Sequence, residues 1–141
     1  MIGLDLKTSF IVDTRKVLAA MDKAKRRSLA RGGALVRTIA RRSIRKRRGI
    51  SEPGRPPSSH SGELRLIFFG YDEAADAVVV GPIRFRSAAS AADRVPTLLE
   101  QGGVVVREGE PVEYDERPFM GPAVETAAPR LAEMFRDTLR T

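Results

Sequence analysis

The chain has 141 residues, 42% of them hydrophobic, and carries a formal net charge of +7. This length suits one domain with one hydrophobic core, so we expect a single domain over residues 1–141. The absence of cysteine excludes disulfides and thiolate metal sites, and with one histidine only carboxylates remain as further metal ligands.

The apolar runs are too short to cross a membrane. The run at 77–80 is among the longest, whereas a membrane span needs about 20 apolar residues. The N-terminal stretch 1–7 carries charges between its apolar residues, which is not typical of a secretory signal. We therefore expect no membrane partner and synthesis in the cytoplasm.

The charge differs between the two parts of the chain. Residues 1–48 hold 15 Lys/Arg and 3 Asp/Glu, a net charge of +12, whereas residues 49–141 hold 10 and 15, a net charge of −5. Such an asymmetry bears on partners and solubility and says nothing about the fold.

The first predicted elements are a short strand and a long basic helix. Residues 1–12 alternate apolar with polar side chains, which is the period of a strand. Residues 14–48 lack proline, are rich in Ala, Leu, Lys and Arg, and carry an apolar stripe, so they predict a helix. This helix would be about 50 Å long and would project from a domain of this size. Gly32 and Gly33 inside it predict either a kink or a division into two shorter helices, or else a close approach by a neighbouring subunit.

A loop rich in proline and glycine follows at residues 49–62. Three prolines and three glycines in fourteen residues exclude regular structure there. A loop of this length in a compact domain is usually functional or disordered.

Residues 63–116 predict an antiparallel sheet of about four strands. The stretches 64–69 and 77–83 are rich in β-branched and aromatic residues. The polar residues 71–76 between them suit the turn of a β-hairpin.

The second half of this region contains the other two strands. Residues 84–93 form a connection of small residues, and 95–101 predict a helical turn. Valine-rich residues 104–106 and residues 112–114 then predict two strands that pair with each other.

A C-terminal helix is expected at residues 121–140. Pro122 suits its first turn, and apolar residues recur at helical spacing beyond it. Pro129 lies inside this helix and predicts a bend. The order of elements predicts an α+β fold, with a long N-terminal helix and the C-terminal helix packed on the sheet.

No catalytic constellation is evident in the sequence. His60 lies among serines on the proline-rich loop, but a nucleophile needs a base that a third group holds at hydrogen-bond distance. We therefore interpret His60 as a solvated loop residue. Nothing in the sequence places two of Glu63, Glu100 and Glu108 together as an acid–base pair. We expect no enzymatic activity.

No cofactor or metal site is evident either. Asp72, Glu73 and Asp76 lie close together, but they lack the alternate spacing and the later glutamate of a calcium loop. We interpret them as turn residues. The glycine pairs at 32–33 and 102–103 lack the lysine or the fingerprint spacing of a phosphate-binding motif.

The basic segment 15–48 is the strongest functional signal. It holds 14 Lys/Arg and one acid, Asp22, and like charges at i, i+4 destabilise a helix. Nucleic acid phosphates, an acidic surface of a partner chain or bulk counterions would compensate this charge. There is no helix-turn-helix spacing and no aromatic platform for single strands. The residues expected to face a subunit or DNA are Arg26, Arg27, Arg31, Arg37, Arg41, Arg42, Arg45, Lys46, Arg47 and Arg48.

Four stretches together resemble one known family. They are Pro-Gly-Arg-Pro-Pro-Ser-Ser-His-Ser-Gly-Glu-Leu at 53–64, the hairpin at 67–82, Pro-Thr-Leu-Leu-Glu-Gln-Gly-Gly at 96–103 and Arg-Pro-Phe-Met-Gly-Pro-Ala at 117–123. In this order they resemble the tail-completion or neck proteins of long-tailed bacteriophages and prophages, which include minor tail components and head–tail joining proteins. Gln101 departs from the family pattern, which has an aromatic or apolar residue there.

The resemblance implies a structural role in the virion. Such proteins have an α+β fold with a long N-terminal helix and no catalytic residues, and they assemble in the host cytoplasm at the junction of head connector and tail tube. The implied partners are further copies of the chain in a ring, such as a hexamer or dodecamer, the connector and tail-tube proteins, and packaged DNA. The residues expected to form an assembly loop are Pro53, Arg55, Pro56, Pro57 and His60.

The residue patterns fit this role. A helix too long for its own domain can be buried between subunits, and a basic and an acidic part can complement each other across a heterologous ring interface. The sequence therefore predicts a structural virion protein of the neck or tail. The alternative is a basic nucleic-acid-binding protein that uses residues 15–48, whose affinity would fall steeply with salt.

Overall fold

The computed structural model describes residues 13–83 and 95–138 of the chain. The strand expected within 1–12 and the connection at 84–93 lie outside these residues. The fold is α+β, and no helix among the described residues is long and apolar enough to span a membrane. The elements in order are α1 Thr14–Ser43, β1 Arg45–Lys46, β2 Ser58–Ser59, the 3₁₀ helix η1 Glu63–Arg65, β3 Ile67–Asp72, β4 Ala77–Pro82, α2 Val95–Gln101, β5 Gly103–Arg107, β6 Glu110–Tyr114 and α3 Met120–Thr138.

Helix α1 begins where the sequence predicts and ends five residues earlier than predicted. The Asp13 carboxylate accepts a hydrogen bond from the backbone N–H of Lys16 and so caps the first turn. Ile44 leaves the helix with φ −79° and ψ 115°, and its side chain is buried in the core. The basic residues 45–48 are therefore not helical. An extended backbone separates successive side chains onto opposite faces and so relieves the repulsion between them.

The glycine pair in α1 allows two other elements to approach the helix. The helix runs through Gly32 and Gly33 without interruption. A Cβ at Gly32 would lie 2.8 Å from Leu131 of α3, and a Cβ at Gly33 would lie 2.6 Å from Val78 of β4. The glycine pair therefore accommodates close packing within the chain, whereas the prediction concerned an approach by a neighbouring subunit.

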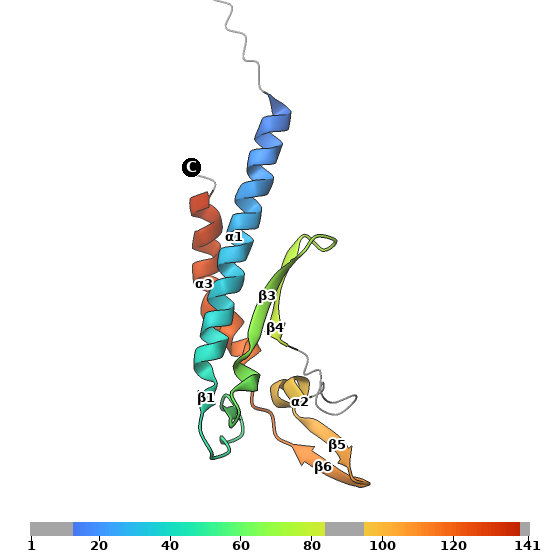
Figure 1. The fold of residues 1–141 in the computed structure, drawn as a ribbon. Coiled ribbons are helices and arrows are strands. Elements are labelled where there is room, and N and C mark those ends of the chain that lie inside the picture. The colour runs from blue at the N-terminus through green and yellow to red at the C-terminus, as the bar shows by residue number, and fades with distance from the viewer. Residues whose placement is uncertain (1–12, 84–94, 139–141) are drawn as a thin grey trace, which may run out of the picture.

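Both α3 and the β3–β4 hairpin pack against α1. Figure 1 shows α3 antiparallel beside α1, with the hairpin along another side of α1. The expectation that the C-terminal helix packs on the sheet is therefore wrong. Small residues explain the difference, since Ala123 and Ala127 of α3 and Ala40 of α1 are buried and allow the two helices to approach closely.

The strands do not form one four-stranded sheet. β3 pairs with β4 antiparallel from Ile67 opposite Pro82 to Asp72 opposite Ala77, and β5 pairs separately with β6. The third ladder joins β1 and β2 in parallel, so the proline–glycine loop contains a two-residue strand where no regular structure was expected. Pro82 in β4 and Pro111 in β6 lack the N–H that would continue a ladder. The expected four-stranded sheet is corrected to separate two-stranded pairs.

Several predicted boundaries also change. The first strand of the hairpin begins at Ile67 because Gly62, with φ 86°, leads into η1 and places Leu64 in the core. The helical turn at 95–101 is confirmed as α2. Helix α3 continues through Pro129, whose missing N–H leaves the carbonyl of the exposed residue Glu125 open to water.

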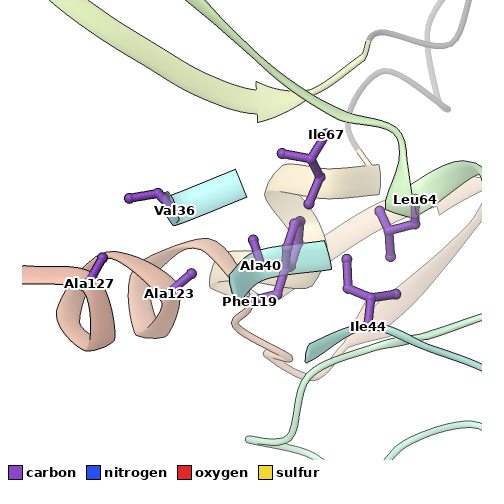
Figure 2. Packing of buried hydrophobic residues seen from close by; sticks show 8 residues of the cluster. All are labelled: Val36, Ala40, Ile44, Leu64, Ile67, Phe119, Ala123 and Ala127. Carbon is purple, nitrogen blue, oxygen red and sulfur yellow. The ribbon is translucent and has the colours of Figure 1, made fainter. Parts of the chain in front are cut away.

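The hydrophobic core is small. Figure 2 shows the buried residues of α1, η1, β3 and α3 gathered around Phe119. Its eight buried members are Val36, Ala40, Ile44, Leu64, Ile67, Phe119, Ala123 and Ala127. Three of these eight are alanines, so the core contains few large side chains.

Candidate functional site

Two cations near the middle of the basic helix are paired with the β3–β4 hairpin. Lys25 forms an ion pair with Asp76. Arg26 lies 3.6 Å from a carboxylate oxygen of Glu73, and its guanidinium lies 4.9 Å from the centroid of the Tyr71 ring. The same chain thus supplies part of the anionic compensation that the sequence predicts.

The carboxylates of the hairpin turn also stabilise the turn itself. Asp72 accepts hydrogen bonds from the backbone N–H groups of Ala74 at 3.0 Å and Ala75 at 3.2 Å. Asp76 accepts one from the Tyr71 hydroxyl. The interpretation of these acids as turn residues is confirmed. In the described part of the chain, no group of three His, Asp or Glu residues is arranged to hold a metal ion.

Arg37 is also engaged within the chain. Its Nε donates a hydrogen bond to the carbonyl oxygen of Ile67 at 2.7 Å, and its guanidinium lies 5.5 Å from the centroid of the Phe68 ring. Arg37 therefore ties α1 to the start of β3 and has less freedom to meet another molecule.

The other basic residues that the sequence predicts to face a subunit or DNA form no ion pair with any residue that the structure describes. Most of them follow the core-facing part of α1, and all except the half-buried Arg41 are exposed. They are Arg27, Arg31, Arg41, Arg42, Arg45, Lys46, Arg47 and Arg48. The uncompensated positive charge is thus concentrated at the end of α1 and in β1.

Four arginines line an open hollow at this end of the molecule. Arg42 comes from the last turn of α1, Arg45 and Arg47 follow it, and Arg55 comes from the proline–glycine loop. The hollow has a volume of about 550 Å³. Its other lining residues are Ser43, Ile50, Ser51, Glu52 and Pro56. We call this site the basic hollow.

The proline–glycine loop is held in place by the segment before α3. The backbone N–H of Gly54 donates to the carbonyl oxygen of Glu116 at 2.8 Å. Arg117 donates from Nε to the carbonyl oxygen of Ser51 at 3.0 Å, and its side chain is only 13% exposed. Arg117 also contacts Asp115. Contacts within one chain therefore set the shape of this loop.

The strand pair β1–β2 positions the other side of the hollow. Arg45 lies opposite Ser58 in the parallel ladder, and Arg47 Nε donates to the Ser58 hydroxyl at 2.9 Å. The His60 ring forms a hydrogen bond with the carbonyl oxygen of Arg48. No hydrogen bond joins His60 to a serine among the described residues, so the geometry offers no nucleophile–base pair.

The structure brings together only some of the predicted site residues. Arg42, Arg45, Arg47, Arg55 and Pro56 line the basic hollow. The remaining loop residues are placed elsewhere: Pro57 and His60 line a neighbouring hollow of about 330 Å³, and Pro53 lines neither. The basic residues predicted to face a subunit or DNA therefore belong to two different sites. Arg26 and Arg37 contact the β3–β4 hairpin, whereas Arg42, Arg45 and Arg47 line the basic hollow.

Glu100 is a residue whose role the sequence analysis missed. Its carboxylate accepts hydrogen bonds from the backbone N–H groups of Phe119 at 2.9 Å, Met120 at 3.0 Å and Gly121 at 2.7 Å. These are the unpaired donors at the start of α3, so Glu100 caps that helix from α2. A signal existed, because the sequence before Met120 offers no Ser, Thr, Asp or Asn as an adjacent cap.

Comparisons with protein-family models, with curated proteins and with solved structures found no match to this chain. The resemblance to phage neck proteins therefore stays a prediction.

Proposed function

We propose that this protein is a non-enzymatic structural subunit of the neck or tail of a long-tailed bacteriophage, where it completes the tail or joins it to the head connector. In this proposal the chain assembles as a ring. The order of the four family-like stretches motivates the proposal. The structural observation that carries it is the imbalance between buried and exposed apolar side chains.

Exposed apolar side chains outnumber buried ones in this fold. Among the described residues, five hydrophobic side chains larger than alanine are buried and fifteen are exposed. Contiguous exposed apolar surface in a soluble protein marks sites of interaction. Val17, Leu18 and Met21 are neighbours on α1 by their helical spacing, and Val104 and Val106 share one face of β5. A subunit with neighbours on several sides would cover such a surface.

The distribution of charge supports a heterologous arrangement. Arg27 and Arg31 are exposed near the middle of α1, whereas Glu108, Glu110 and Glu113 are exposed on the β5–β6 hairpin, which lies beyond the C-terminal end of α1 (Figure 1). A closed ring brings different surfaces of adjacent subunits together. Opposite charges on the two surfaces would favour the correct docking orientation.

Deletion of the gene from a phage that encodes it tests this function. We expect separated heads and tails, or tails with abnormal ends, in negative-stain images, and restoration of joined particles by the wild-type gene in trans. Normal infectious particles in its absence would contradict the proposal.

The second candidate function is nucleic-acid binding by the basic segment. The observation that favours it is the uncompensated charge at the end of α1 and around the basic hollow. A filter-binding titration across salt concentrations separates the two functions. Strong binding of DNA by the isolated monomer at physiological salt would favour this candidate over a purely structural role.

A further inference from the structure

We infer that the basic hollow is a binding site for a phosphate group. The inference concerns a ligand of this chain and does not depend on whether the protein belongs to a virion. Four arginines and one acid, Glu52, line the hollow. Arginine presents a planar fork of N–H donors that matches phosphate oxygens, so this lining favours an oxyanion.

The arginines of the hollow keep their donors available. Arg42, Arg45 and Arg55 form no ion pair with any residue in the described ranges 13–83 and 95–138. Arg47 uses Nε for the Ser58 hydroxyl, which leaves its two terminal nitrogens for a ligand. Glu52 comes within ion-pairing distance of none of the four. The positive charge of the hollow is therefore not cancelled within the chain.

Ser51 supplies an independent indication of a ligand. Its side chain is 6% exposed, and its hydroxyl oxygen has no hydrogen-bond partner among the described residues. A buried hydroxyl without a partner is unusual, because burial removes the water that would otherwise bind it. Ser51 lines the hollow together with the arginines. A phosphate oxygen there would accept the missing hydrogen bond once the Ser51 hydroxyl rotates towards the hollow.

The backbone around the hollow is already in place. Arg117 and Glu116 hold Ser51 and Gly54 by hydrogen bonds of 3.0 and 2.8 Å. The backbone N–H of Arg55 donates to the carbonyl oxygen of Glu52 at 3.1 Å. A ligand therefore has to order only the arginine side chains, which lowers the entropic cost of binding.

The ligand chemistry follows from the number of donors and the size of the hollow. A tetrahedral phosphate offers more acceptor oxygens than a planar carboxylate, so it can engage several guanidinium groups and the Ser51 hydroxyl together. At about 550 Å³ the hollow also has room for atoms attached to the phosphate. The phosphate can thus belong to a free small molecule or to the backbone of a nucleic acid.

The first experiment compares melting temperatures of the full chain in sodium phosphate and in sodium chloride at equal ionic strength. The variants are Arg55→Gln and, as a control with the same loss of charge, Arg130→Gln on the exposed side of α3. Phosphate stabilises many proteins without binding them, because it is excluded from their surface. The decisive quantity is therefore the difference between the variants in how far phosphate raises the melting temperature. We expect phosphate to raise the melting temperature of wild type and Arg130→Gln clearly more than that of Arg55→Gln.

Two further variants sharpen this test. Glu52→Gln removes the one acid of the lining, so the stabilisation by phosphate is expected to increase. Arg45→Gln, at an exposed position in β1, replaces Arg55→Gln if the latter does not fold. Equal responses of wild type, the arginine variants and the control would overturn the inference.

The second experiment distinguishes the sources of the phosphate. Fluorescence anisotropy measures binding of a labelled DNA duplex to the same proteins. A nucleic acid source predicts that Arg55→Gln weakens binding by about tenfold more than Arg130→Gln, which is the lower part of the range for one strong arginine contact. If Arg55→Gln and Arg130→Gln weaken DNA binding equally, while phosphate still raises the melting temperature of Arg130→Gln more than that of Arg55→Gln, the site binds a small phosphorylated ligand. If neither phosphate nor DNA distinguishes the variants and Arg55→Gln abolishes self-association in sedimentation, the arginines meet another subunit and the inference is wrong.

Discussion

The carboxylate oxygen Oε1 of Glu100 lies 2.7 Å from the backbone nitrogen of Gly121. This contact joins the end of α2 to the start of α3, which lie in two of the four family-like stretches. A Cβ at position 121 would lie 3.1 Å from the same oxygen, so glycine gives the carboxylate room to approach. The two stretches therefore act as one capping unit, with the negative charge placed at the positive end of the helix dipole.

Replacement of Glu100 by alanine tests this unit. Because three backbone donors lose their acceptor, we expect the free energy of unfolding to fall by about 1–2 kcal/mol. Urea denaturation followed by circular dichroism measures the change. Glu108→Ala is the control, since Glu108 is exposed in the β5–β6 turn. Equal stability of the two variants would show that the cap contributes nothing.

Alanine at Gly33 tests the close approach of the hairpin to α1. The new Cβ would lie 2.6 Å from Val78 and 3.0 Å from Phe69, so the hairpin would have to move. Overpacking of this kind costs about 1–3 kcal/mol, against a gain of about 1 kcal/mol in helix propensity. We expect a net loss in melting temperature. Gly49→Ala, which would meet nothing within 4 Å, is expected to leave stability nearly unchanged.

Arg117→Ala is expected to release the proline–glycine loop. The guanidinium of this largely buried residue holds the Ser51 carbonyl, and hydrogen bonds to a charged group contribute about 1.5–3 kcal/mol. We expect faster hydrogen exchange at the backbone N–H of Gly54, together with a smaller response to phosphate. Unchanged exchange there, with normal exchange in Arg130→Ala, would mean that other contacts shape the loop.

A charge introduced on the β5 strand tests the proposed assembly. Val104 and Val106 are 62% and 68% exposed, so Val104→Glu/Val106→Glu is expected to change monomer stability by no more than about 0.5 kcal/mol per site. If β5 is covered by a neighbour, the double variant will fail to complement a phage that lacks the gene. Glu110→Gln on the paired strand is the control. Full complementation by the double variant would remove β5 from the interface.

Local sequence patterns determined most elements of the fold. The absence of proline and the helix-forming composition predicted the helix that begins at Thr14, and α2 and the two hairpins lie close to their predicted positions. Helical propensity, turn chemistry and apolar periodicity act over a few residues, so they can be read from one segment at a time. The charge excess of residues 1–48 likewise pointed to the basic end of α1.

Tertiary structure alone decided how these elements meet. Burial of Ile44 and the pairing of Arg45 with Ser58 end α1 earlier than predicted. Buried alanines allow α3 to pack against α1. The cap by Glu100 and the meeting of Arg42 with Arg55 join residues more than ten positions apart. Such contacts depend on how the whole chain packs, because no local preference of either partner determines which distant group it will face.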